Sequence, residues 1–200
     1  MTKRYAFIDV QNTDTTTKKL LGFIIDWQKL FLFLKDSWNC EKVFLYIGVD
    51  EGDLETTKML EDLEKEGCIV RSKIVFAYKN KDKDIEVLCP ACQHKFIEHI
   101  NTGYNRKSNC DVDLTVDAME LAGNGKEFYI FTGDGDFDFL IRKLNSKNTK
   151  VHIVSSSKKI KSGPRYFTSR FSTKLRKLVA ENPNLVNFIN INNLRFRIQK

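Results

Sequence analysis

Three aspartates lie within five residues of one another in the segment FTGDGDFDFLI, residues 131–141. They are Asp134, Asp136 and Asp138, and the apolar run 128–131 leads directly into them. Carboxylates this close repel one another and raise each other's pKa unless a positive charge lies between them. Because the apolar run predicts a buried strand, the segment places this negative charge at the end of a strand and indicates a site for a cation.

Two further aspartates are placed to join this cluster. Asp9 ends the strand-like segment 5–8, and the carboxyl ends of parallel strands lie on one edge of a sheet, so Asp9 is expected beside Asp134 and Asp136. Asp111 begins a helical pattern, CDVDLTVDAMEL. A helical projection centres the apolar arc near Asp111, and this arc includes Val112, Leu114, Val116, Ala118, Met119, Leu121 and Ala122. The opposite, solvent-like face carries Asp113, Asp117 and Glu120.

The sequence therefore predicts four inward carboxylates: Asp9, Asp111, Asp134 and Asp136. Hard oxygen ligands favour Mg²⁺ or Mn²⁺, and such ions promote phosphodiester cleavage. Gly133 and Gly135 suit a tight turn that lets a phosphate approach the backbone. In the alternative interpretation, Asp134 and Asp136 cap the following helix and Asp9 is an acid of a surface loop.

The elements that would position these residues alternate between short apolar runs and helical patterns. Strands are predicted at 5–8, 43–47, 68–70 with 74–76, 128–132 and 151–154, and helices at 23–38, 53–67, 111–122, 137–144 and 171–180. This alternation predicts an α/β domain with a parallel sheet and helices on both faces. We expect one domain over residues 1–200, with a cysteine-bearing insertion at 79–108 and a basic C-terminal extension at 155–200.

Three segments resemble, in chain order, the signatures of the NYN domain family: FIDVQN, KSNCDVDLTVDAMELA and FTGDGDFDFLIRKL. That family belongs to the PIN-like nucleases, and KVHIVSSS and NNLRFRI are similar to its LabA-like branch. The resemblance implies a three-layer, PIN-like (Rossmann-like) fold. It also implies a metal-dependent ribonuclease with Asp9, Asp111, Asp134 and Asp136 as its acidic site and with Asn12 and Asp117 in supporting roles. Asn109 and Cys110 depart from the branch, which usually has glycine and valine there.

The insertion carries Cys89-Pro90-Ala91-Cys92, which resembles the first knuckle of a zinc ribbon. Two thiolates spaced in this way bind Zn²⁺ well, but a second CxxC is missing. His94 and His99 are the nearest candidates for the other ligands, and the alternative is two free thiols in a surface loop. Cys110, at a usual valine position, is expected to be a small buried side chain.

The C-terminal part is strongly basic, since residues 141–200 contain fifteen Lys or Arg and one acid, Glu181. Such a segment beside an acidic body predicts a polyanionic partner, and interleaved aromatic residues favour single-stranded RNA. Phe171 is expected in the core. The candidate contacts to RNA are Lys158, Lys159, Lys161, Arg165, Arg170 and Lys174.

The remaining expectations concern assembly, location and rival functions. The apolar helix 23–38 predicts either a homodimer interface or deep burial in the monomer. No apolar run is long enough for a secretion signal or a membrane span, so we expect a cytoplasmic protein with reduced thiols. A non-catalytic RNA-binding regulator is the main alternative function. A haloacid-dehalogenase-type phosphatase is disfavoured, because Gln11 stands where that chemistry needs an acid/base.

Overall fold

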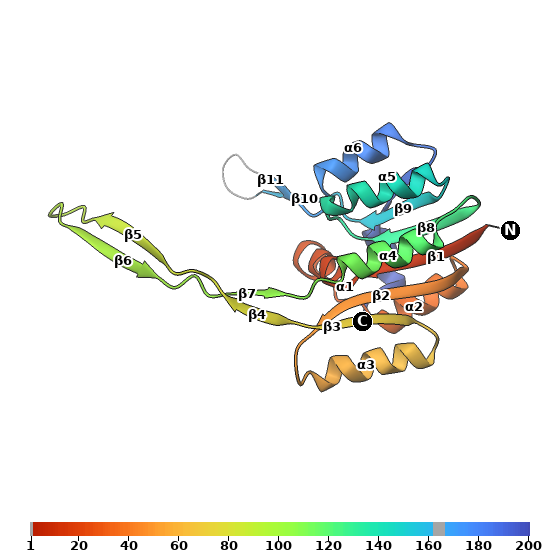
Figure 1. Ribbon diagram of the computed structural model, residues 1–200, viewed down its shortest axis with the longest axis horizontal. Helices are drawn as coiled ribbons and strands as arrows, with labels where there is room; N and C mark the ends of the chain where they lie inside the picture. Colours follow the sequence, from red (N-terminus) through yellow and green to blue (C-terminus); the bar gives the residue numbers. More distant parts are fainter. Residues whose placement is uncertain (1, 162–166) are drawn as a thin grey trace.

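A parallel sheet of six strands forms the centre of the computed structural model, which describes residues 2–161 and 167–200 (Figure 1). The strands run in the spatial order β12-β9-β8-β1-β2-β3, and every neighbouring pair is parallel. Their bounds are β1 Lys3–Asp9, β2 Cys40–Val49, β3 Ile69–Ile74, β8 Lys126–Phe131, β9 Lys150–Ser155 and β12 Val186–Asn190. The predicted α/β fold with a parallel central sheet is confirmed.

Helices cover both faces of this sheet. One face packs against α1 Val10–Thr15, the π-helical turn Thr16–Leu21, α2 Trp27–Asp36, α3 Leu54–Lys65, the 3-10 turn Ile191–Leu194 and α7 Arg195–Ile198. The other face packs against α4 Asp111–Leu121, the 3-10 turn Gly135–Phe137, α5 Asp138–Ser146 and α6 Thr173–Glu181. None of the helices in the described part of the chain has the length and apolarity that a membrane span needs.

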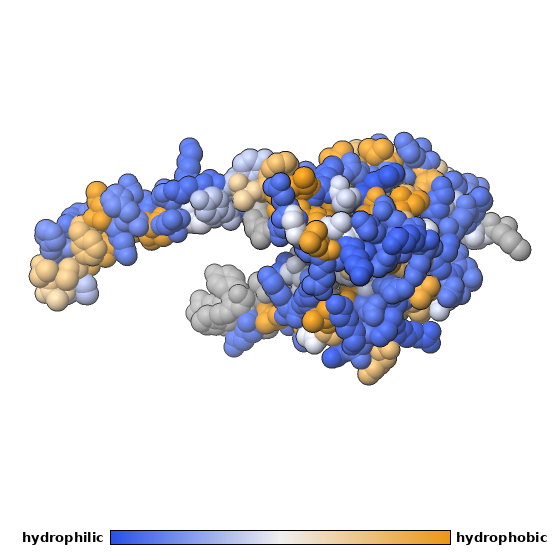
Figure 2. All heavy atoms as spheres, turned by 90° about the horizontal axis from the view of Figure 1, so that it is seen from below, coloured by the Kyte–Doolittle hydropathy of each residue, from blue (hydrophilic) through white to orange (hydrophobic). Residues whose placement is uncertain are grey.

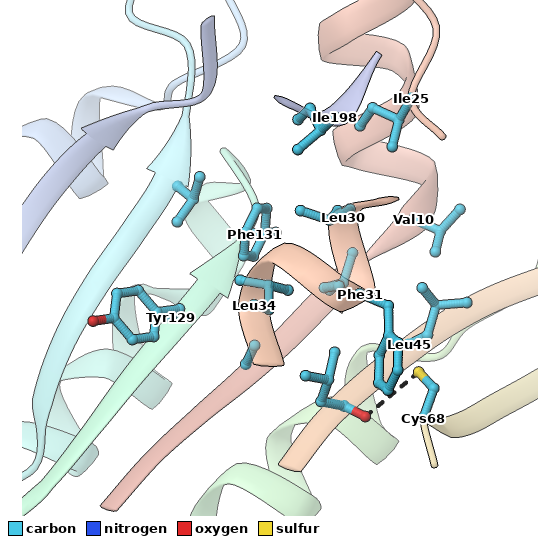
Figure 3. Close-up of a cluster of buried hydrophobic side chains, with 14 of the residues drawn as sticks. Val10, Ile25, Leu30, Phe31, Leu34, Leu45, Cys68, Tyr129, Phe131 and Ile198 are labelled. Carbon is cyan, nitrogen blue, oxygen red and sulfur yellow. Dashed lines mark hydrogen bonds between the residues drawn. The ribbon is translucent and has the colours of Figure 1, made fainter. Parts of the chain in front are cut away.

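The central strands contribute side chains to two separate cores, because successive side chains of a strand point to opposite faces of the sheet. In β1, Ala6 and Ile8 join the core under α2, whereas Tyr5 and Phe7 join the core under α4 and α5. Figure 3 shows the first of these cores, in which Leu30 and Leu34 of α2 lie against Phe131 of β8. In the same view the Cys68 thiol donates a hydrogen bond to the Val43 carbonyl, 3.5 Å away.

The predicted helix at 23–38 is shorter than expected, and one of its faces is buried in the monomer through Leu30, Phe31 and Leu34. It spans Trp27–Asp36, and Asp26 caps it by accepting from the Lys29 N–H at 3.0 Å. Phe33 packs on the Trp38 ring with 5.3 Å between ring centroids, while Leu32 stays exposed. Most of the apolar side chains of this segment therefore pack against other residues of the same chain.

The orientation predicted for α4 is partly wrong. Leu114 and Ala118 are fully buried, but Val112 is 59% exposed and Val116 is 49% exposed. The Asp117 side chain, expected to face solvent, is only 13% exposed. The buried stripe therefore follows residues 114, 117 and 118, because Asp117 has partners on the sheet that make its burial tolerable.

A long antiparallel arm leaves the sheet after β3 (Figure 1). Its base pairs β4 Phe76–Lys79 with β7 Tyr104–Lys107, and its outer hairpin pairs β5 Lys83–Leu88 with β6 Lys95–Ile100. The joint between the two pairs is held by Asn80, whose N–H donates to Gly103 O at 2.9 Å. The predicted insertion at 79–108 lies almost entirely within this arm.

The basic segment 155–200 is an integral part of the domain rather than an appended tail. It supplies the edge strand β12, the helix α6 and a small hairpin of β10 Lys159–Lys161 and β11 Phe167–Ser169. Phe171 is buried, as expected, and α6 begins two residues later with Ser172 as its N-cap. Strand β12 was missed, because the asparagines in VNFIN hide the apolar alternation.

Matched substitutions in α4 test its orientation. Leu114→Ala removes a fully buried side chain and should lower the free energy of unfolding by about 2–5 kcal/mol. Val116→Ala, two residues away, should change it by no more than about 0.5 kcal/mol. Urea denaturation followed by circular dichroism would measure both values, and equal losses would contradict the observed orientation.

Candidate active site

Asp9 lies at the end of β1 and caps α1. Its Oδ1 accepts from the Asn12 N–H at 3.1 Å, and its Oδ2 accepts from the Thr132 hydroxyl at 3.3 Å. Thr132 is buried just after β8, and its Oγ1 also accepts from the Asp134 N–H at 3.2 Å. Thr132 thus links two of the predicted acids, although sequence reasoning did not single it out.

The loop after β8 is shaped by its own aspartates and by Asn12. The Asp136 N–H donates to Asp134 Oδ1 at 3.0 Å, so Asp134 caps the following turn, as one of the two interpretations expected. The side-chain oxygen of Asn12 accepts from the Gly133 N–H at 2.9 Å. Asn12 therefore ties the loop after β1 to the loop after β8, which is a supporting role in holding the two acidic segments together.

The acidic residues interact electrostatically across these loops. Burial, together with the charges of Asp111 and Asp134, raises the pKa of Asp9 to about 6, although the hydrogen bonds from Asn12 and Thr132 oppose the shift. Partial burial and the charges of Asp134 and Asp136 also raise the pKa of Asp111. Residues that are more than 100 positions apart in the sequence therefore share one electrostatic environment.

The four carboxylates form an open cluster. Asp9 and Asp111 line the same small hollow, but only Asp9 is half-buried, and Asp111, Asp134 and Asp136 are exposed. The prediction of four inward carboxylates is therefore wrong for these three residues, which lie at or near the open side of the cluster. Asp136 lies at the rim, with its side chain 89% exposed and the Lys174 ammonium 4.0 Å from its Oδ1. Among residues 2–161 and 167–200, no three His, Cys, Asp or Glu side chains are close enough to hold a metal as placed. The Mg²⁺ or Mn²⁺ ligand set therefore stays a prediction, and the excess of carboxylate oxygens is the donor chemistry that suits such an ion.

A larger cavity of about 350 Å³ adjoins the acidic hollow. The two share Gln11, Gly48 and Ser108 in their walls. Any side chain at Gly48 would overlap Ser108, so glycine is needed there for the base of the arm to approach β2. Sequence reasoning missed this cavity, because no motif connects Gly48 with Ser108.

The predicted role of Gly133 needs correction. A side chain there would overlap the backbone carbonyl of Arg170, and the Ser172 N–H donates to Gly133 O at 3.0 Å. The space above this glycine is filled by the chain itself, so it is not open to a phosphate. This close approach brings the basic segment beside the acidic loop. The Ser155 hydroxyl, also beside Gly133, is buried without a hydrogen-bond partner among the described residues.

Asp117 is bound to the protein instead of facing solvent. The Arg71 guanidinium contacts both carboxylate oxygens at 3.1 and 3.2 Å, and the Tyr46 hydroxyl donates to Oδ2 at 2.9 Å. Burial and the Asp117 charge raise the pKa of Tyr46. With its charge neutralised by Arg71, Asp117 fastens α4 to β2 and β3, and so supports the position of Asp111.

The departures from the family pattern are accommodated at the start of α4. The side chain of Asn109 accepts from the Asp111 N–H at 3.2 Å, and its carbonyl accepts from Lys73 at 2.9 Å. Cys110 is buried, which confirms the expectation of a small core side chain.

The predicted zinc ligands are only partly brought together. Cys89 and Cys92 lie in the turn at the tip of the arm, where backbone N–H groups of Cys92 and Ala91 bond to the Cys89 sulfur and lower the pKa of its thiol. His99 pairs with Asp84 at 2.6 Å, near the other end of the outer hairpin. Its selection as a ligand is wrong, because five residues of strand, roughly 15 Å, separate it from the turn.

The β10–β11 hairpin, which carries two of the predicted RNA contacts, projects outward from the end of the sheet at which the arm also leaves (Figure 1). Lys159, Lys161 and Arg170 are exposed, and Arg170 borders a cavity of about 410 Å³. Lys158 donates to Leu20 O at 3.1 Å, so part of its role is structural. Arg165 lies outside the described residues.

Comparison with known proteins gives a consistent identification. The NYN domain family model matches residues 4–173. The chain is 31% identical over 68 residues to "Low amplitude and bright protein LabA" of Synechococcus elongatus, a match that covers 34% of this chain and 37% of that protein. A Vibrio parahaemolyticus protein of unknown function has a similar crystal structure, with a TM-score of 0.61 and 19% identity, over 95% of this chain and 93% of that one. At this identity the structural likeness shows the fold alone.

The raised pKa of Asp9 predicts a pH-dependent effect of Asp9→Asn. The folded protein holds the Asp9 proton more tightly than the unfolded chain, whose value is near 3.8, so the ionised carboxylate lowers stability. This loss is absent below about pH 4 and complete above about pH 6. In EDTA, Asp9→Asn should therefore be more stable than the wild type at pH 7, by up to about 3 kcal/mol, and nearly equal to it at pH 4.

Urea titrations at both pH values would measure the difference. Asp14→Asn is the control, because the Asp14 carboxylate is paired with Lys18 at 2.9 Å, and its effect should stay within about 0.5 kcal/mol. An Asp9→Asn variant that is less stable than wild type at pH 7 would contradict the electrostatic account.

Proposed function

Because this chain belongs to the NYN domain family, we propose that it is a divalent-metal-dependent endoribonuclease that hydrolyses RNA phosphodiester bonds at its acidic cluster. A domain of this family suggests a nuclease or an RNA-related function. The observation that carries the proposal is that Asp9, half-buried at the end of β1, lines one hollow with Asp111 of α4 and lies near the charge of Asp134 in the loop after β8. Burying one carboxylate beside other negative charges lowers stability, and cation binding would account for such an arrangement.

The ligands in this proposal are Asp9, Asp111 and Asp134, with Asp136 at the rim. Mg²⁺ or Mn²⁺ held there would polarise the scissile phosphate and favour ionisation of an attacking water. Two hydrogen bonds fix Asp9 relative to the acidic loop: the Thr132 hydroxyl donates to Asp9 at 3.3 Å, and the Gly133 N–H donates to Asn12 at 2.9 Å. The pKa of Asp9 near 6 means that this carboxyl is mostly ionised at neutral pH, so it can act as a ligand there.

RNA would reach the cluster along the basic segment. The close packing of residues 170–172 on Gly133 sets Arg170 and Lys174 beside the acidic loop. Lys159 and Lys161 extend positive charge along the exposed β10 strand. These side chains can neutralise backbone phosphates on either side of the reacting bond, which supports a flexible, single-stranded substrate.

Binding of RNA without cleavage is the alternative function, and one observation favours it. The carboxylates of the described residues are not drawn together at metal-ligand distances. Such a protein would keep the basic surface and use the acidic cluster only to shape the loops around it. Cleavage and binding therefore need separate measurements.

Asp134→Asn should abolish Mn²⁺-dependent cleavage of a labelled single-stranded RNA, lowering the rate by a factor of about 100 or more, because it removes one of the charges that would hold the ion. RNA binding, measured by fluorescence anisotropy, should change by less than about threefold. Asp138→Asn is the matched control at the start of α5, because Asp138 is paired with Arg142 at 3.2 Å. RNA binding without Mn²⁺-dependent cleavage by the wild type would favour the alternative, and phosphate release from a small phosphoester would favour a phosphatase.

The double variant Lys159→Ala, Lys161→Ala should weaken RNA binding at low salt. Each phosphate contact that is lost should also reduce the slope of log affinity against log salt concentration by about 0.7. Lys177→Ala is the control, because Lys177 pairs with Glu181 on α6. If the affinity and the slope of the double variant were unchanged, the β10 strand would not be part of the RNA-binding surface.

A further inference from the structure

The outer hairpin of the arm is exposed on both of its faces. Figure 2 shows apolar side chains interspersed along the arm, and those exposed on the hairpin are Ile85, Leu88, Phe96, Ile97 and Ile100. No helix of the described chain packs on it (Figure 1). A two-stranded hairpin with both faces in water is only marginally stable by itself. The arm therefore presents surface that is suited to a partner.

The tip of this hairpin presents two thiols in a defined geometry. Cys89 and Cys92 are three residues apart in a six-residue turn, closed by bonds from Cys89 N–H to His94 O at 2.9 Å and from Gln93 N–H to Cys89 O at 2.8 Å. N–H groups of Ala91 and Cys92 bond to the Cys89 sulfur. Gln93 takes a left-handed conformation, with φ of 57°. This turn resembles one half of a tetrahedral four-thiolate site.

The chain does not bring a second half to the tip. No set of three possible ligands gathers there or elsewhere among the described residues. His99 is held by Asp84 near the far end of the hairpin, and Cys40, Cys68 and Cys110 are buried in the domain. His94 lies in the same turn but is not gathered with the two cysteines into a set of three ligands. A zinc ion bound at Cys89 and Cys92 would therefore take two more ligands from outside this chain.

We propose that a zinc ion joins two copies of this protein tip to tip, bound by Cys89 and Cys92 of both chains. A symmetric contact supplies two identical pairs of thiolates, which complete a four-cysteine tetrahedron. The outer hairpin, residues 83–100, carries two lysines and three acids, so it is nearly neutral and can lie against its own copy without strong repulsion. That charge is unsuited to RNA, which would favour a basic arm.

Zinc binding at this junction is a ligand exchange without oxidation. Each of the four thiols gives up a proton to solvent as its sulfur binds Zn²⁺. The arm projects away from the sheet, so two domains joined at their tips would keep their acidic clusters apart (Figure 1). The proposal does not depend on nuclease activity, because its readouts are mass and metal content.

The full-length protein, purified with zinc and a phosphine reductant that prevents disulfides, would be tested by light scattering after size exclusion and by metal analysis. The expected result is a particle of twice 23.3 kDa with one zinc per two chains, which EDTA converts to a monomer. Replacing zinc by Co²⁺ should give the intense sulfur-to-cobalt absorption of a four-thiolate site.

Two variants distinguish the role of the tip cysteines from the role of the rest of the arm. The double variant Cys89→Ser, Cys92→Ser should be monomeric and free of zinc, with an unchanged circular dichroism spectrum. His99→Asn should keep both zinc and the dimer. One zinc per monomer, the absence of zinc, or a dimer that survives both EDTA and the double substitution would each overturn the proposal.

Discussion

The burial of Asp9 beside the negative charges of Asp111 and Asp134 is the constraint on which the arrangement of this site depends. Hydrogen bonds from Asn12 and Thr132 favour the ionised form of Asp9, but burial and the neighbouring charges outweigh them and raise its pKa to about 6. Asp9 and Asp134 are held near each other because β1 and β8 are adjacent parallel strands. The loops that follow these two strands therefore lie at the same edge of the sheet. The position of the negative charge is thus determined by the order of the strands in the sheet, and not by one loop alone.

Positive charge is distributed in a way that leaves this cluster incompletely neutralised. Arg71 pairs with Asp117 and Lys73 with Asp113, and these two ion pairs fasten α4 to β3. Arg142 pairs with Asp138 inside α5. In the described chain, Lys174 makes the one ion pair to the four predicted ligands, at the rim and at 4.0 Å. The same segment carries Arg170 past Gly133, so one packing contact sets the basic surface beside the acidic loop.

Much of the fold could be predicted from the sequence, because the buried strands are short apolar runs between clear helical patterns. The acids at strand ends followed from the same pattern. The orientation of Asp117 could not be predicted, because its partners, Tyr46 and Arg71, are 71 and 46 residues away. A helical projection assigns the Asp117 carboxylate to the solvent face, because it contains no information about the Arg71 guanidinium on β3. The role of Gly133 was hidden for a similar reason, since Arg170 fills the space only in three dimensions.

Calorimetric titration with Mn²⁺ near pH 6, in two buffers of different ionisation enthalpy, tests the central claim most directly. We expect a site that is lost in Asp9→Asn and that releases a substantial fraction of a proton on binding, because Asp9 is partly protonated at that pH. Absence of Mn²⁺ binding, or binding that Asp9→Asn leaves unchanged, would contradict a cation site at these carboxylates.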